Sequence, residues 1–200
     1  MKEQHIIEKS FELFQKYGIK SVTMDDLSTE LGMSKKTLYQ YFNDKADLVS
    51  KIVFFEFNRK SQQIEKVLNG DGNALEQLLA LNKFMHKEHK NYKPGMLFDL
   101  KKYFPEVYQS FSKAKRDFMY ASFIKNLIKG KEEGIYRQDL DENIIAKLHL
   151  FRNENIIEND IFTFDEITSS KFVNEIFNYH LHGIVNEQGL KILKENSKQS

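Results

Sequence analysis

The chain has 200 residues, 40% of them hydrophobic and 30% charged, which is the composition of an ordinary globular protein able to bury a core. It contains no cysteine, and this excludes a disulfide scaffold, a thiolate metal site and a cysteine nucleophile. The formal net charge of +1 excludes a broadly basic coat, so any attraction to an acidic polymer must come from locally placed residues.

The first expected element is an amphipathic helix from about residue 3 to Tyr17. Ile7, Phe11 and Phe14 recur at helical spacing, and Gly18 is placed to end the helix in a left-handed cap. The first residues lack the apolar run of a signal peptide, and nowhere do about 18 apolar residues run together as a membrane span requires. We therefore expect a cytoplasmic protein.

Two short helices joined by a tight turn are predicted next. Thr23 and Asp26 have the spacing of a capping box at the start of the first helix, which should stop at Gly32. Ser34 can cap the second helix, so only Gly32, Met33 and Ser34 separate the two. This pattern is typical of a helix-turn-helix, whose second helix can enter the DNA major groove.

The stretch SKKTLYQYF, residues 34–42, is the predicted second helix of this motif. Helical geometry puts Leu38 and Phe42 on one side, where they would pack against the preceding helices. The opposite side would present polar groups to base edges, with a tyrosine on each flank. This outward face consists of Lys36, Thr37 and Gln40, flanked by Tyr39 and Tyr41.

Three lysines stand in the first turns of helices, where the helix dipole disfavours a cation by roughly 0.3 to 1 kcal/mol. A phosphate backbone would neutralise Lys35 and Lys36, whereas the alternative is that both are solvated surface residues. Lys45, at the start of the next helix, is also predicted to contact phosphate. Its alternative is a surface ion pair with Asp44 or Asp47.

The remaining elements are also predicted to be helices. Asn43 or Asp44 can cap a long helix to about Leu68, and NGDGN, residues 69–73, is a clear break. No alternating apolar run is long enough to indicate a sheet, so we expect an all-α fold. The further helical patterns cover about residues 74–90, 96–103, 105–133, 142–157 and 165–194.

The stretch FELFQKYGIKSVTMDDLSTELGMSKKTLYQYFNDKADL resembles the DNA-binding segment of the TetR family of bacterial transcription regulators, over about residues 6–50. The chain departs from the usual family pattern at Lys36, where glycine is usual, and at Leu27 and Ser28, where isoleucine and alanine are common. The departure at Lys36 affects which DNA sequence this segment is expected to prefer. The matching positions are Phe14, Gly18, Thr23, Leu31, Gly32, Ser34, Leu38, Tyr39, Phe42, Lys45 and Leu48.

The resemblance implies a ligand-responsive transcription regulator, usually a repressor, that binds a pseudo-palindromic operator as a homodimer. Residues 1–50 would form the small three-helix DNA-binding domain, residues 44–68 the linking helix, and residues 51–200 a helical effector-binding and dimerisation domain. At the positions that match the family pattern, the resemblance implies contacts with DNA. These residues are Thr23, Lys35, Lys36, Thr37, Tyr39, Gln40, Tyr41 and Lys45.

For the larger domain the resemblance supplies a role but no residues. The predicted dimer surface lies in FVNEIFNYHLHGIV, where Phe172, Ile176, Tyr179 and Gly183 share a stripe, although a stripe within the core would leave the same pattern. A pocket for a small apolar or aromatic effector would be lined by residues of the central helices, each of which can equally be plain core. The candidates are Phe84, Met85, Phe98, Tyr103, Phe104, Phe118 and Phe123.

Evidence for catalysis is weak. His86 and His89 stand one helical turn apart, but no third metal ligand is near, and His180 and His182 fall on different helix faces. The stretch GDGNAL lacks the third glycine of a dinucleotide-binding loop. We therefore expect no enzyme activity, metal or cofactor. The alternative function is an architectural or protein-interaction module that uses a helix-turn-helix without sequence preference.

Overall fold

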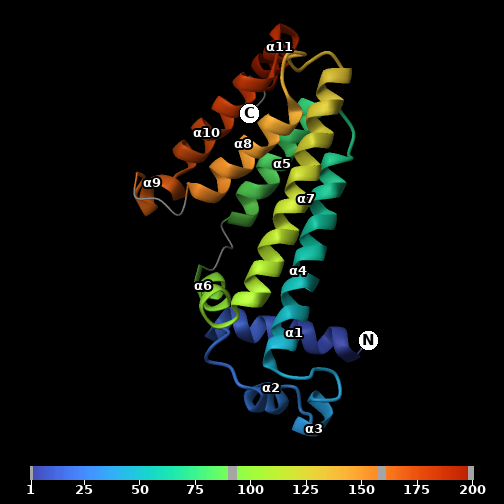
Figure 1. Cartoon of the computed structure of the whole chain (residues 1–200), viewed down its shortest axis with the longest axis vertical. Helices are drawn as coiled ribbons and strands as arrows, with labels where there is room; N and C mark the ends of the chain where they lie inside the picture. Colours follow the sequence, from blue (N-terminus) through green and yellow to red (C-terminus); the bar gives the residue numbers. More distant parts are fainter. Residues whose placement is uncertain (1, 90–93, 157–160, 198–200) are drawn as a thin grey trace. The chain divides into compact units, whose positions relative to one another are not determined.

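The computed structural model describes residues 2–89, 94–156 and 161–197. Within these residues the secondary structure is helical, apart from an isolated antiparallel bridge between Tyr136 and Val185 (Figure 1). The predicted all-α fold is confirmed. The chain divides into two compact units.

Unit 1 comprises Met1–Gln63 and Glu88–Lys115. Its core is aliphatic and aromatic, with Ile6, Phe14, Leu27, Leu38 and Phe42 all at most 1% exposed. Its helices are α1 (Lys2–Tyr17), α2 (Met24–Glu30), α3 (Lys35–Leu38), most of α4 (Lys45–Leu68), α6 (Pro94–Tyr103) and the first turns of α7 (Pro105–Glu132).

Unit 2 comprises Ile64–Lys87 and Arg116–Ser200. Its core includes Leu75, Tyr136, Ala146, Leu181 and Ile184. Besides the ends of α4 and α7, it contains α5 (Ala74–His89), α8 (Glu142–Asn155), α9 (Phe164–Thr168), α10 (Ser170–Ile184) and α11 (Glu187–Ser197). The compact units differ from the predicted functional division near residue 50, which remains a prediction.

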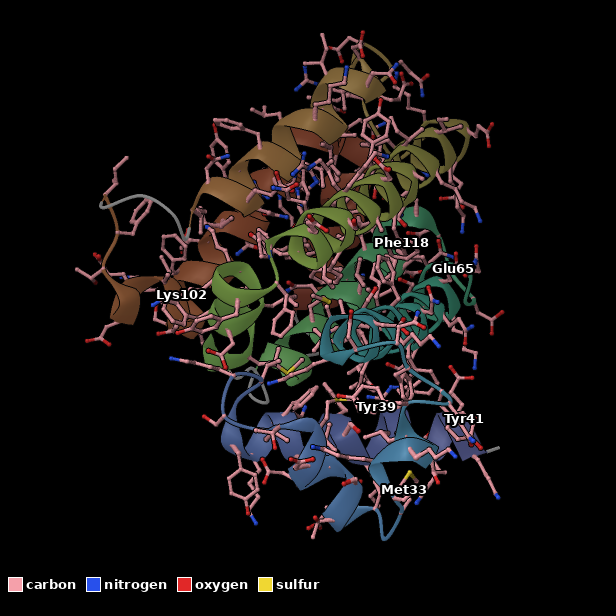
Figure 2. All side chains as sticks on the ribbon, turned by 60° about the horizontal axis from the view of Figure 1, so that its bottom comes forward. Met33, Tyr39, Tyr41, Glu65, Lys102 and Phe118 are labelled. Carbon is pink, nitrogen blue, oxygen red and sulfur yellow. The ribbon has the colours of Figure 1, made fainter. Side chains whose placement is uncertain are left out.

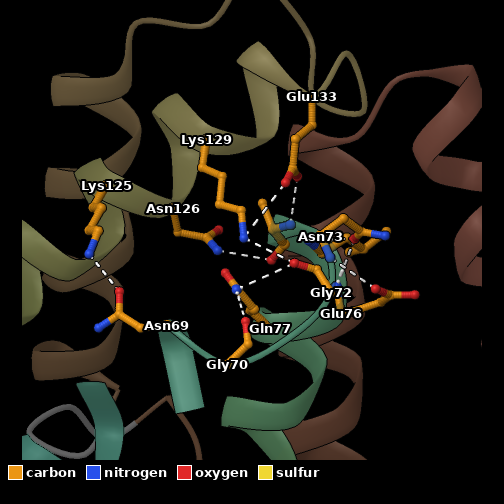
Figure 3. Close-up of polar contacts among 12 residues, drawn as sticks. Asn69, Gly70, Gly72, Asn73, Glu76, Gln77, Lys125, Asn126, Lys129 and Glu133 are labelled. Carbon is orange, nitrogen blue, oxygen red and sulfur yellow. Dashed lines mark hydrogen bonds and ion pairs between the residues drawn. The ribbon is translucent and has the colours of Figure 1, made fainter. Parts of the chain in front are cut away.

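The turn between α4 and α5 is held by side chains of α7 (Figure 3). Lys125 donates to the Asn69 side-chain oxygen at 2.6 Å, and Lys129 donates to the Gly72 carbonyl at 3.0 Å. Asn126, which is buried, donates to the carbonyl of residue 74 at 2.9 Å. The predicted break at residues 69–73 is confirmed, and its polar backbone groups are satisfied from a helix more than 50 residues away.

Most predicted helices end within two residues of the expected positions, but the single helix expected over residues 165–194 is wrong. Residues of that stretch form α9, α10 and α11. Ser169 is extended and caps α10, while the side-chain oxygen of Asn186 accepts the N–H of Gly189 at 3.1 Å and so caps α11. Asn186 also donates to the Gly134 carbonyl at 2.8 Å, a tertiary contact that local periodicity does not reveal.

Candidate nucleic-acid interface

The start of α2 is fixed by a capping box between Thr23 and Asp26. The backbone N–H of Asp26 donates to the Thr23 hydroxyl at 3.1 Å, and the N–H of Thr23 donates to the Asp26 carboxylate at 2.8 Å. These hydrogen bonds from Thr23 lower the pKa of Asp26, which keeps a negative charge at the positive end of the helix. The predicted capping box is confirmed.

The turn between α2 and α3 is closed by hydrogen bonds on both sides. Gly32 has a φ of 62°, in the left-handed region that glycine adopts without strain. The N–H of Met33 donates to the Ser28 carbonyl at 2.9 Å, and the Ser34 hydroxyl accepts the N–H of Thr37 at 3.1 Å. These contacts start α3 at a defined position after α2.

Helix α3 is shorter than predicted. The helix expected over residues 34–42 ends at Leu38, and Tyr39 forms its carboxyl cap. The N–H groups of Gln40 and Tyr41 then donate to carbonyls three residues back, at 3.2 and 3.1 Å, as in a tight final turn. The hydrophobic pattern continues through such a turn, so spacing alone overestimated the helix.

Two buried side chains anchor this segment in the core of unit 1. Leu38 is fully buried and Phe42 is 1% exposed, which confirms the predicted inner side. On the outer side Lys36 and Gln40 are exposed. Tyr39 is 46% exposed, and its place in this segment is labelled in Figure 2. The segment therefore presents amide, ammonium and phenol groups to solvent while its apolar side fixes its orientation.

The two lysines of α3 differ in their surroundings. Lys35 forms an ion pair with Asp25 of α2, and this pair offsets the unfavourable position of the ammonium at the helix start. Lys36 is exposed and forms no ion pair with the residues that the structure describes. Of the two, Lys36 therefore has the charge that is more available to a phosphate.

Lys51 of α4 connects three parts of unit 1, a role that the sequence did not suggest. Its ammonium contacts the Glu3 carboxylate at 2.9 Å and donates to the Tyr41 carbonyl at 3.0 Å. It also lies 4.9 Å from the centre of the Phe42 ring. Lys51 thus ties the turn after α3 to both α1 and α4.

A surface hollow of about 390 Å³ borders this segment. Its lining is mainly apolar and includes Met33 from the turn, together with Thr37 and Tyr41, both half-buried. The full lining is Lys2, His5, Ile6, Leu31, Gly32, Met33, Thr37 and Tyr41.

Residues 6–52, which contain this whole arrangement, match the family model described as bacterial regulatory proteins, tetR family. We refer to the matched residues, 6–52, as the tetR-family segment. The similar curated proteins include the uncharacterized HTH-type transcriptional regulator YvaF of Bacillus subtilis, 34% identical over 103 residues, or 50% of this chain and 53% of that protein. YerO, another uncharacterized HTH-type regulator of Bacillus subtilis, is 24% identical over 175 residues, or 80% of this chain and 58% of that protein.

The chain thus spans just over half the length of these two relatives. Both are named as transcriptional regulators, in agreement with the prediction that the chain is not an enzyme. Among solved structures, reduced NemR of E. coli has a TM-score of 0.70 at 15% identity, covering 93% of this chain and 98% of that one. A putative TetR-family regulator from Mesorhizobium loti has a TM-score of 0.67 at 18% identity, covering 92% and 97%. At these identities the similarity shows the fold.

Within the tetR-family segment, Lys45 is turned toward the domain interior. It is half-buried, and its ammonium donates to the Lys20 carbonyl at 3.3 Å and lies 6.0 Å from the centre of the Phe104 ring. Burial lowers its pKa, while the charges of Asp99 and Asp26 act in the opposite direction. A phosphate contact by Lys45 remains a prediction, and it requires the side chain to leave this position.

The seven candidate effector-pocket residues are divided between the two units. Phe98 is 60% exposed and belongs to unit 1, as do Tyr103, whose ring lies 4.9 Å from the Lys20 ammonium, and Phe104. The other four, Phe84, Met85, Phe118 and Phe123, pack in the core of unit 2.

The predicted dimer stripe on α10 is only partly buried. Tyr179 is 79% exposed and Gly183 is exposed, while Phe172 and Ile176 are half-buried. Helix α8, which lies beside α10 (Figure 1), carries a second exposed apolar stripe that the sequence reasoning missed. It consists of Ile144, Leu148 and Phe151, which are 62%, 60% and 65% exposed.

In the described part of the chain no three potential metal-ligating side chains come together. The side chains of His86 and His89 lie outside the described residues, so the structure does not bear on that pair. His180 is half-buried and His182 is exposed. No helix among the described residues is both long and apolar enough to cross a membrane.

Proposed function

We propose that the protein is a cytoplasmic, sequence-specific DNA-binding regulator that acts as a homodimer on a pseudo-palindromic operator, usually repressing until a small molecule binds. The observation that carries this proposal is the tetR-family segment with Leu38 and Phe42 buried and Lys36, Tyr39 and Gln40 outward. This arrangement lets base edges meet side chains that the core holds in place.

Eight residues are proposed to contact DNA. Tyr39 would reach the backbone from its exposed position, and Gln40 would read base edges. The side chain of Thr23 forms capping hydrogen bonds and is still exposed. Lys35 would have to contact DNA while it is paired with the Asp25 carboxylate. The full set remains Thr23, Lys35, Lys36, Thr37, Tyr39, Gln40, Tyr41 and Lys45.

A DNA-selection experiment at fixed salt tests this assignment. The chain should enrich one pseudo-palindromic site, and Gln40→Ala should relax the preference at one base pair by about 1–3 kcal/mol. Tyr39→Ala should weaken binding to all sequences about equally, because its phenol would contact a phosphate. Tyr17→Ala is the matched control, since Tyr17 is a similarly exposed tyrosine, 52%, at the end of α1.

Enrichment of no site, or equal binding by the Tyr39→Ala and unaltered chains, would contradict the proposed interface. Binding without sequence preference would favour the alternative, an architectural module.

The homodimer is supported by the apolar stripes on α8 and α10. Leu148 at 60% exposure and Tyr179 at 79% are large side chains left in water on two helices that contact each other, and an exposed apolar surface of this kind marks an interaction site. At Gly183 an added methyl group would meet nothing within 4 Å in the same chain, so a partner helix has room to approach. A dimer would also place two recognition segments about one DNA turn apart.

Leu148→Glu is expected to raise the dimer dissociation constant at least about 100-fold, because a carboxylate would be desolvated in the centre of an apolar interface. Sedimentation equilibrium measures this constant. Ile128→Glu, at another exposed apolar position on α7, should leave it unchanged. If the Leu148→Glu protein keeps the original dissociation constant, the α8–α10 face is not the dimer surface.

The response to a ligand is proposed to be a shift in population between two arrangements. A 100-fold change in DNA affinity requires a differential binding energy of about 2.7 kcal/mol. Contacts of α6 in unit 1 offer a route, because Asp99 accepts the N–H of Lys20 at 2.9 Å, just before α2. Movement of α6 would therefore disturb the loop that precedes the proposed DNA-contacting helices.

A further inference from the structure

Arg152 on α8 differs from the other three arginines of the chain. Arg59, Arg116 and Arg137 are exposed and contact carboxylates at 2.5, 3.0 and 2.6 Å. Arg152 is half-buried and has no carboxylate partner in the described part of the chain. Among the described residues, the arginine with the least access to water thus lacks a counter-ion, which is the costlier arrangement.

Two histidines lie beside this guanidinium inside unit 2, and a phenylalanine packs against their rings. The rings of His149 on α8 and His180 on α10 lie 4.2 Å apart between centres, and the Phe123 ring of α7 packs edge-on at 3.9 Å from His149. Burial lowers the pKa of His149 to about 2 and that of His180 to about 4, so both are neutral near pH 7. Arg152 therefore supplies the positive charge of the cluster.

Both ring nitrogens of His149 are engaged in hydrogen bonds with neighbouring side chains. Arg152 Nη2 lies 2.9 Å from His149 Nδ1, and arginine only donates, so Nδ1 accepts and the ring proton is on Nε2. The side-chain nitrogen of Asn153 lies 3.0 Å from Nε2, and since two donors cannot share this contact, the Asn153 amide is assigned with its oxygen toward the ring, where it accepts the Nε2 proton. His149 thus orients the guanidinium and has no capacity left for another partner.

Arg152 and His180 can each form further hydrogen bonds. The Nε of Arg152 is buried without an acceptor, and Nη1 reaches the Ile176 carbonyl only at 3.4 Å. Neither ring nitrogen of His180 has a hydrogen-bond partner among the described residues, although the side chain is only half-buried. A buried donor without an acceptor normally costs about 1–3 kcal/mol, so this group of atoms favours an incoming acceptor.

We propose that Arg152 and His180 bind the carboxylate of an acidic small molecule whose apolar part packs near Phe123. The inference rests on the proposed function, in which a small molecule controls the regulator. One guanidinium beside two neutral imidazoles matches one negative charge, which favours a monocarboxylate over a phosphate dianion. Since Nε is buried in this arrangement, the guanidinium must shift within the α8–α10 contact to accept the ligand.

Matched pairs of acid and amide test this proposal: octanoate with octanamide, and phenylacetate with phenylacetamide. Titration calorimetry of the full chain without DNA should detect binding of at least one acid, and its amide should bind at least about 10-fold more weakly. Arg152→Met should weaken the acid about 10- to 100-fold, the range expected for a hydrogen bond to a charged group. Arg116→Met is the control, because Arg116 is exposed and already paired with Glu154.

Nuclear magnetic resonance gives a second readout at the arginine itself. The Nε–H signal of Arg152, assigned by its loss in Arg152→Lys, should shift with the acid and not with the amide. If the Arg152 variants fail to fold, His180→Phe supplies the test and should weaken the acid by about 10-fold.

Three results would overturn the proposal: no acid binds, the amides bind equally well, or Arg152→Met and His180→Phe leave acid binding unchanged. If Arg152→Met instead raises the dimer dissociation constant and no acid binds, the missing carboxylate belongs to a second copy of the chain. Because these titrations omit DNA, failure of operator selection would contradict the proposed function without affecting this result.

Discussion

Replacing Gly130 with alanine is expected to destabilise the protein by about 3 kcal/mol, near the upper end for an overpacked core. A Cβ atom at Gly130 would lie 2.1 Å from Cδ2 of Tyr136, whose side chain is fully buried. Tyr136 is held in place, because its hydroxyl donates to Asn126 at 3.1 Å and its backbone bridges to Val185. The gain of about 1 kcal/mol from alanine in a helix is too small to compensate.

Urea unfolding of the two proteins measures this difference. Gly95→Ala is the matched control, because Gly95 is also helical and an added methyl group there would meet nothing within 4 Å. The control should be neutral or slightly stabilised. Equal stability of the Gly130→Ala and unaltered proteins would contradict the close packing of α7 against Tyr136.

Acid is expected to destabilise the protein over a pH range set by His149, which is buried, and His180, which is half-buried. Burial depresses the pKa of His149 to about 2 and of His180 to about 4, whereas both would titrate near 6.5 in the unfolded chain. Below pH 6.5 the unfolded state therefore binds more protons than the folded state. The contribution of the two histidines to the free energy of unfolding is fully present above that pH and is lost as the pH drops toward 4. At pH 5 the loss from the two groups together is about 4 kcal/mol at most.

Free energies of unfolding at pH 7.5 and pH 5 test this expectation. His180→Phe should remove roughly half of the difference, because one of the two proton uptakes is lost. His182→Gln is the control substitution, since His182 is an exposed histidine on the same helix. A pH dependence that is the same in the His180→Phe and unaltered proteins would show that His180 is not buried in its neutral form.

The amino-acid sequence by itself determined the elements whose signals lie within four residues of one another. The periodic apolar residues of α1, the capping box of Thr23 and Asp26, and the glycine turn of residues 69–73 are of this kind. Each depends on backbone conformation and nearest-neighbour hydrogen bonds, so a local reading is sufficient. The resemblance over about residues 6–50 has the same origin, because the spacing in a helix-turn-helix is local.

Only the tertiary structure decided the features that join distant residues. The break before α11 depends on the contact of Asn186 with Gly134, and the inward position of Lys45 depends on Lys20 and Phe104. The spacing of Ile144, Leu148 and Phe151 is visible in the sequence, but such a stripe usually faces its own core. The packing of α8 against its neighbours decides both the exposure of these residues and the proximity of Arg152 to His180. Helical periodicity specifies the faces of a helix, but packing determines which face is covered.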